Sequence, residues 1–95
     1  MAQILDRAMV VARGAVAREI DGNFTIYDKE NDSVMVLNDS ASAIWRLCDG
    51  RTGSAIVDEL AHHYEANRHE IERDVEAVLE RLMTSGLLVR DVVGS

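Results

Sequence analysis

Three histidines lie close together in the second half of this 95-residue chain, and they are the first candidates for metal binding. His62 and His63 are neighbours, and His69 follows on the next predicted helix. Neighbouring residues on a helix point about 100° apart, so His62 and His63 cannot easily face one ion. Their spacing also fits neither HExxH nor paired CxxC motifs. We therefore expect solvated histidines near helix ends, with no metal site and no cofactor.

A nucleophile is the next possibility, and Cys48 is the single cysteine of the chain. Cys48 falls on the apolar face of a predicted helix, where a small buried thiol is common. One cysteine cannot form an internal disulfide, so the cysteine count does not indicate an oxidising compartment. We expect a thiol in the core and not a catalytic group.

Carboxylates are the most abundant reactive side chains, and many lie between residues 58 and 80. They are Asp58, Glu59, Glu65, Glu70, Glu72, Asp74, Glu76 and Glu80. Catalysis by a carboxyl pair needs burial that raises the pKa of one partner. These residues instead occupy the polar sides of two amphipathic helices. We predict no catalytic residues and a protein that is not an enzyme.

The overall charge narrows the choice of partner. Seventeen acidic against ten basic residues give a net charge of −7, which repels phosphate backbones and favours partners with positive charge. Charged residues interrupt every apolar run in the first twenty residues, so we expect neither a signal peptide nor a membrane span, and a cytoplasmic protein. The length predicts one domain, over residues 15–89, with a flexible N-terminal arm at 1–14 and a tail at 90–95.

The first structured part of the chain reads as a three-stranded antiparallel meander. Residues 15–20 and 23–27 alternate or favour strands, and Asp21-Gly22 between them is a preferred pair for a tight hairpin turn. A polar turn then leads to the apolar strand 34–37, which runs directly into a helix. This third strand lies at an edge unless the first folds back beside it, and an edge strand can pair with another chain.

Helices dominate the second half of the chain. Apolar periodicity and capping residues predict helices at residues 39–49, 53–65 and 68–85, followed by a short strand or wing at 87–89. Trp45 on the first helix is expected to anchor the core. The elements make an α+β domain in which the helix order and short connections resemble a winged helix-turn-helix.

One flank of the third predicted helix borders its apolar stripe. At 100° per residue, Glu70, Asp74, Ala77 and Arg81 lie together there. A groove between this flank and the strand 34–37 could hold an extended peptide, bound through the backbone of the strand and selected by pockets for alternate side chains. The alternative is that these residues are merely exposed. Met35 on the strand fits either a core or a peptide contact.

The order of short motifs along the chain resembles the PqqD-like proteins. The motifs that carry the resemblance are Leu37-Asn38, Ile44-Trp45, Asp49-Gly50-Arg51-Thr52, Ile56-Val57-Asp58-Glu59-Leu60, Asp74-Val75, Leu79, Leu82 and Gly86-Leu87-Leu88. Together they span about residues 16–89. The chain departs from the family pattern at Gly53-Ser54, where stronger helix formers are usual, so the start of the second helix is expected to be looser.

The resemblance implies a winged-helix domain that binds the leader segment of a ribosomally made precursor peptide (RiPP), without catalysis. The leader would add as a strand beside the third strand and lie against the third helix. Its contacts, carried over by position, would be Val34, Met35, Val36, Leu37, Asp74, Ala77, Val78 and Arg81.

The resemblance also implies a partner enzyme to which the peptide is delivered. This would be a radical S-adenosylmethionine protein in pyrroloquinoline quinone (PQQ) assembly or a leader peptidase in lasso peptide biosynthesis. The alternative is a winged-helix DNA-binding regulator, although Arg68, Arg73 and Arg81 on the third helix are diluted by acids. A homodimer through the exposed strand edge also stays open.

Overall fold

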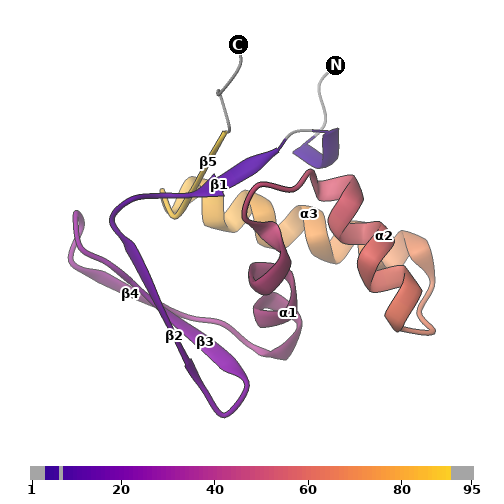
Figure 1. Cartoon of the computed structure of the whole chain (residues 1–95), viewed down its shortest axis with the longest axis horizontal. Helices are drawn as coiled ribbons and strands as arrows, with labels where there is room; N and C mark the ends of the chain where they lie inside the picture. The colour runs from indigo at the N-terminus through magenta and orange to yellow at the C-terminus, as the bar shows by residue number, and fades with distance from the viewer. Residues whose placement is uncertain (1–3, 7, 91–95) are drawn as a thin grey trace.

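The computed structural model describes residues 4–6 and 8–90 and contains a three-stranded sheet, a two-stranded ribbon and three α-helices (Figure 1). In chain order the elements are η1 (Ile4–Asp6), β1 (Met9–Val11), β2 (Ala15–Ile20), β3 (Asn23–Asp28), β4 (Ser33–Val36), α1 (Asp39–Cys48), α2 (Gly53–His63), α3 (Arg68–Thr84) and β5 (Leu88–Arg90). The predicted α+β fold is confirmed, and each predicted helix ends within two residues of its predicted boundary.

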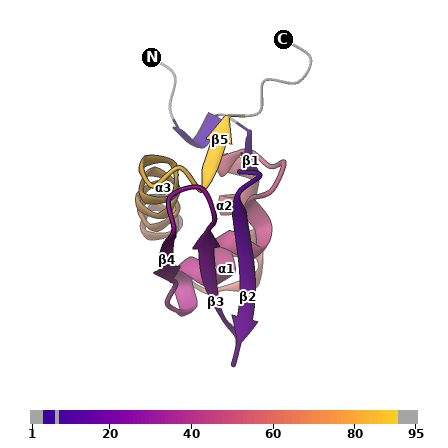
Figure 2. The same ribbon diagram turned by 90° about the vertical axis from the view of Figure 1, so that its left-hand side faces the viewer.

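The meander forms because its turns have the right residues. Asp21 and Gly22 both have positive φ, at 52° and 88°, as a tight hairpin turn between twisted strands requires. The sheet order is β2-β3-β4, so β4 lies at an edge as predicted. In Figure 2 the three strands lie side by side, with β4 on the same side of the molecule as α3.

Each helix begins with a side chain that caps the backbone. The side chains of Asn38, Thr52 and Asn67 accept hydrogen bonds from backbone N–H groups in the first turns of α1, α2 and α3. The apolar faces then meet in one core that includes Ile26 of β3, Trp45 of α1 and Leu79 of α3. The predicted burial of Trp45 and Cys48 is confirmed.

The prediction of a flexible N-terminal arm is wrong for the described residues 4–6 and 8–14. β1 pairs antiparallel with β5, in the register Val10 to Val89, and forms a two-stranded ribbon at the upper edge of Figure 1. Leu5 and Met9 are buried in the core. This packing involves partners some eighty residues away along the chain, so no local pattern could indicate it. The predicted tail at 90–95 lies outside the described residues except for Arg90, which ends β5.

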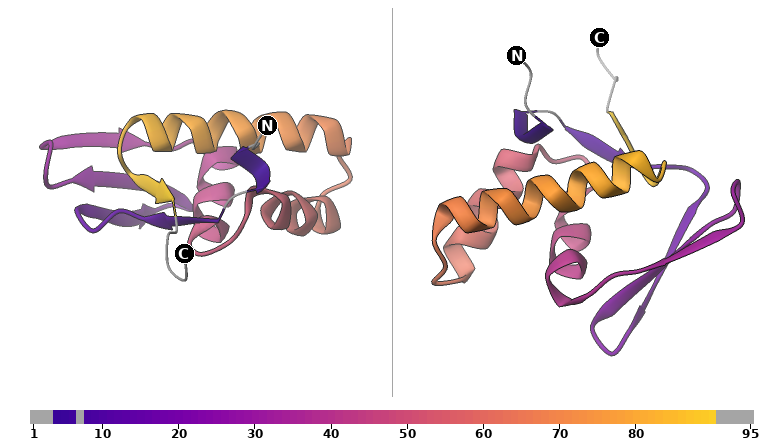
Figure 3. Two further views of the ribbon diagram at one scale, coloured as in Figure 1. Left: turned by 90° about the horizontal axis from the view of Figure 1, so that it is seen from above. Right: turned by 180° about the vertical axis from the view of Figure 1, so that it is seen from behind.

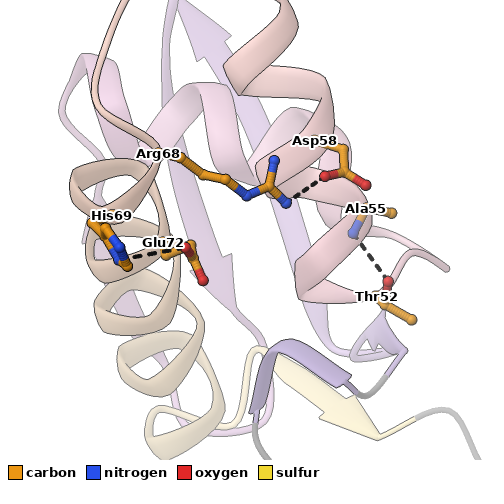
Figure 4. A network of polar contacts seen from close by, with 6 residues as sticks. All are labelled: Thr52, Ala55, Asp58, Arg68, His69 and Glu72. Carbon is orange, nitrogen blue, oxygen red and sulfur yellow. Dashed lines mark hydrogen bonds and ion pairs between the residues drawn. The ribbon is translucent and has the colours of Figure 1, made fainter.

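Gly53 explains why this chain departs from strong helix formers at the start of α2. A Cβ atom at this position would lie 2.7 Å from the Cα of Leu5, closer than real Cβ contacts allow. Glycine therefore lets η1 pack directly on α2, and the helix start is held by the Thr52 hydroxyl, which accepts from the Ala55 N–H at 3.1 Å (Figure 4). The residue that sequence reasoning associated with looseness is a packing contact.

Candidate peptide-binding site

The outer edge of β4 has no strand partner among the described residues. On its inner side, the Leu37 N–H donates to the Phe24 carbonyl oxygen at 2.8 Å, just beyond the β3–β4 ladder. Backbone groups of successive strand residues point to opposite sides. Leu37 and Met35 therefore bond toward β3, whereas the N–H and C=O groups of Val34 and Val36 point outward. β5, the last strand of the chain, pairs with β1 and leaves this edge open.

The side chains of β4 divide between the two faces of the sheet. Leu37 is buried and Met35 is half-buried against the core. Of the two roles predicted for Met35, core packing and peptide contact, the structure thus shows core packing for part of the side chain. Val34 and Val36 are 62% and 67% exposed on the opposite face. Val34 lies there in one cross-strand row with Tyr27 and Val16, both exposed. At the outer edge, Val34 and Val36 thus offer backbone groups, and their side chains form part of an exposed apolar sheet face.

The predicted flank of α3 is one continuous exposed surface. Asp74, Ala77 and Arg81 are exposed, whereas Val78 is half-buried and packs against the core. Helix α3 and strand β4 follow the same side of the molecule in the view from above in Figure 3 and in Figure 2. The structure therefore brings the two predicted walls to one side, with a small residue, Ala77, between two charges of opposite sign. Asp74 also lines two surface hollows, one beside Glu70 and Ala77 and one reaching α1.

A buried serine that the sequence reading missed joins the sheet to α1. The Ser42 hydroxyl accepts from the Phe24 N–H at 2.9 Å and donates to the Leu37 carbonyl oxygen at 3.4 Å. These two bonds hold the start of β3 and the end of β4 against the helix. A hydroxyl on the otherwise apolar face of a helix was the available signal.

The polar turn between β3 and β4 is held by Asp28. Its carboxylate accepts from the Glu30 N–H at 3.0 Å and from the Asn31 side-chain amide at 2.7 Å. These bonds, the amide one above all, hold the pKa of Asp28 below its usual value despite burial. Nearby, the Tyr27 hydroxyl donates to Asp32 at 2.7 Å, which raises the pKa of Tyr27. The turn that precedes the open edge is thus held by side-chain hydrogen bonds.

The cysteine and the histidines considered as reactive groups lie outside strand β4 and the flank of α3. Burial, followed by the nearby Asp49 carboxylate, raises the pKa of Cys48 to about 12, so its thiolate is scarce at neutral pH. His63 faces Glu59 at 3.2 Å and His69 faces Glu72 at 3.8 Å, all near the surface. Within residues 4–6 and 8–90, no group of three His, Cys, Asp or Glu side chains is placed to hold a metal ion.

The corner between α2 and α3 carries an ion pair that neutralises Arg68, one of the basic residues of α3. Arg68 contacts Asp58 at 2.5 Å, and this hydrogen bond raises the pKa of Arg68 (Figure 4). Both partners are more than half exposed, so the pair adds little stability. It does leave the start of α3 without a free cluster of positive charge.

Comparison with protein families decides the classification. Residues 24–88 match the family model described as "Coenzyme PQQ synthesis protein D (PqqD)". The chain belongs to the PqqD family. The matched region contains β3 except for its first residue, the open strand β4, all three helices and the first residue of β5.

Sequence relatives match part of the chain. Proteins named "PqqA binding protein" are 47% identical over 58 residues in Rhodopseudomonas palustris (strain BisB5) and 36% identical over 63 residues in Methylococcus capsulatus (strain ATCC 33009 / NCIMB 11132 / Bath). These matches cover 60% and 65% of this chain. The chain spans 57% and 64% of the length of these two relatives.

Two solved structures share the fold over most of the PqqD-family chain. The complex named "TbiB1 in Complex with the TbiA(beta) Leader Peptide" gives a TM-score of 0.77 at 26% identity, covering 83% of this chain and 93% of that one. "Lasso peptide synthetase B1 complexed with the leader peptide" gives a TM-score of 0.74 at 26% identity, covering 85% of this chain and 96% of that one.

In the described part of this chain no helix is long and apolar enough to cross a membrane.

Proposed function

We propose that this chain binds the leader segment of a ribosomally synthesised precursor peptide as an added strand on β4, lying against α3. The observation that carries the proposal is the open outer edge of β4, where the backbone groups of Val34 and Val36 face away from β3. Two solved structures with the same fold are named as leader-peptide complexes, and sequence relatives are named as PqqA-binding proteins. These names support the same class of ligand.

Affinity comes mainly from the backbone in this mechanism. A guest strand exchanges hydrogen bonds with Val34 and Val36, which any extended peptide can do. Selectivity comes from side chains of the guest that point toward α3, where Ala77 leaves room and Val78 offers an apolar contact. Asp74 and Arg81 then favour guests whose charges oppose theirs. Met35 and Leu37 contribute indirectly, because their side chains pack on the core and hold β4 in place.

We infer that the protein acts by delivery and not by catalysis. The modifying enzyme would be a radical S-adenosylmethionine protein or a leader peptidase, in a PQQ-type or lasso-type pathway. The exposed face of Val16, Tyr27 and Val34 supports a second protein contact, because it places large apolar side chains in one row. A homodimer through the β4 edge would compete with the peptide for the same backbone groups.

The DNA-binding alternative lacks a comparable observation. It needs a basic recognition helix. On α3, Arg68 pairs with Asp58, and the exposed Asp74 lies among the remaining arginines. A gel shift with random duplex DNA tests this alternative directly, and we expect no retarded band.

The decisive experiment replaces the outward backbone donor of β4. Fluorescein-labelled PqqA, the TbiA(beta) leader and peptides selected from a displayed random library are titrated against the chain by fluorescence polarisation. Val36→Pro removes an N–H that points at the guest and should abolish binding of every peptide that the wild-type chain binds. Ala17→Pro is the matched control, because Ala17 faces outward at the opposite open edge, on β2.

Two results would contradict the proposal. One is equal affinity of the wild-type chain and Val36→Pro, with circular dichroism showing both variants folded. The other is failure of the wild-type chain to enrich any extended peptide from the library.

A further inference from the structure

A pocket lies beyond the end of β4, where the start of α1, the end of α2 and the start of α3 meet. Its volume is about 270 Å³. It is lined by Asp39, Ser40, Ala43, Ile44, Leu60, Tyr64, Ala66, Ile71 and Asp74. Ile44 and Ile71 are buried and form an apolar floor, whereas Asp39, Asp74 and Tyr64 are exposed at the rim.

The size and lining of the pocket suit a single apolar side chain. An apolar cavity of about 150 Å³ in another protein accommodates benzene. A pocket of about 270 Å³ therefore has room for a leucine or an aromatic ring. Burial of such a side chain against Ile44, Leu60 and Ile71 would remove apolar surface from water on both partners.

The pocket continues the proposed binding edge. Asp39 and Ser40 follow β4 after only Leu37 and Asn38. Asp74 lies both on the exposed flank of α3 and in the pocket lining. The view from behind in Figure 3 shows the chain passing from β4 into the lower end of α1, with α3 running past its upper end. A guest strand that runs past Val36 toward α1 therefore reaches the pocket while it stays beside α3.

The rim gives the pocket a charge preference. Asp39 of α1 and Asp74 of α3 are exposed carboxylates in the lining, and the ion pairs of the described residues involve other acids. A cation beside the buried side chain would meet two negative charges, in a chain whose net charge is −7. An acidic residue at the same place would be repelled.

We propose that this pocket anchors one large apolar side chain of the guest peptide, flanked in the peptide by Lys or Arg. The inference rests on the proposed function, since it takes the guest to be an added strand on β4. It goes beyond that function because it places the specificity of binding in the α1–α2–α3 corner and not on the strand itself. The apolar cavity provides the anchor, and Asp39 and Asp74 select the flanking charge.

The experiment fills the pocket with a larger side chain and measures the affinity of the chain for selected peptides. A displayed random peptide library is selected on the wild-type chain, and the enriched peptides should share an apolar residue next to Lys or Arg near one end. Ala43→Leu places a larger side chain in the pocket and should weaken binding of these peptides by about tenfold or more, as expected for loss of one buried apolar side chain. Ala55→Leu adds the same atoms at an exposed position of α2 outside the pocket and should leave the Kd unchanged.

A double-mutant cycle makes the assignment specific. Replacing the apolar anchor of the peptide by Ala should weaken binding to the wild-type chain but have little further effect on Ala43→Leu, since both changes remove one contact. Asp39→Asn with Asp74→Asn should reduce the preference for Lys or Arg, whereas Glu80→Gln on the outer part of α3 should not. Thermal unfolding followed by circular dichroism confirms that each variant is folded.

The outcomes separate the two proposals. If Val36→Pro abolishes binding while Ala43→Leu and the anchor substitution are additive or silent, the pocket proposal is wrong and strand addition stands. If selected peptides contain no shared anchor, the pocket proposal is wrong as well. If Val36→Pro has no effect, strand addition fails, and the pocket proposal fails with it.

Discussion

The Phe24 N–H donates to the Ser42 hydroxyl at 2.9 Å, although the two residues belong to a strand and a helix. Ser42 in turn donates to the Leu37 carbonyl oxygen, and Leu37 bonds back to Phe24. This closed set of three bonds fixes the end of β4 on α1 and hence sets the position of the open edge. The open edge is therefore tied to the helical part of the fold at its end.

Removal of the Ser42 hydroxyl should lower the free energy of unfolding. Ser42→Ala leaves the half-buried Phe24 N–H without its side-chain acceptor, at a cost of about 1–3 kcal/mol. Urea unfolding followed by circular dichroism measures this cost. Ser85→Ala, at an exposed position after α3, should change the free energy of unfolding by less than about 0.5 kcal/mol. Equal stability of the two variants would show that the Ser42 bonds do not hold the sheet.

Protonation of Asp28 should destabilise the fold in acid. The hydrogen bonds from Asn31 and Glu30 lower the pKa of Asp28 in the folded state below its value in the unfolded chain. The stabilisation is therefore complete above the unfolded pKa, near pH 4, and is lost as the pH falls toward the lower folded pKa.

Thermal unfolding as a function of pH tests this linkage. The wild-type Tm should exceed that of Asp28→Asn at neutral pH, and the difference should shrink as the pH falls below about 4. Lys29→Gln changes an exposed residue of the same turn and should keep a constant offset. A pH-independent difference for Asp28→Asn would mean that its charge does not stabilise the turn.

A methyl group on residue 53 should separate η1 from α2. Gly53→Ala brings a Cβ within 2.7 Å of the Leu5 backbone, which side-chain rotation cannot relieve, and we expect a loss of about 1–3 kcal/mol. Deletion of residues 1–7 removes Leu5 and should itself destabilise the protein, since Leu5 belongs to the core. In that shortened chain Gly53→Ala should have a much smaller effect. An equal effect in both backgrounds would contradict the close packing.

Charge reversal on α3 should weaken peptide binding in a salt-dependent way. Arg81→Glu or Asp74→Arg should raise the Kd about two- to fivefold at low ionic strength and by less at high ionic strength, as for exposed ion pairs. Arg51→Glu changes the net charge by the same amount as Arg81→Glu but lies in the α1–α2 loop. If both arginine reversals have the same effect, the flank of α3 does not face the peptide.

Local chemistry determined much of this protein before any tertiary contact was known. Asp21-Gly22 predicted the hairpin because positive φ at both positions is a property of those two residues and their turn. Asn38, Thr52 and Asn67 predicted helix starts because capping bonds reach only two or three residues along the chain. The flank of Asp74, Ala77 and Arg81 followed from the geometry of a single helix, and its exposure is confirmed.

Only the tertiary structure decided which edges and cavities remain open. The β1–β5 ribbon, the Ser42 bonds and the contact of Gly53 with Leu5 join residues far apart in sequence, so no local periodicity encodes them. The strand order leaves β4 at the edge of its sheet, and β5 pairs with β1. The corner pocket exists because three helix ends meet without filling the space between them. Local propensity determines the helices and strands, whereas the packing of their apolar faces determines which strand edge and which pocket stay accessible to a partner.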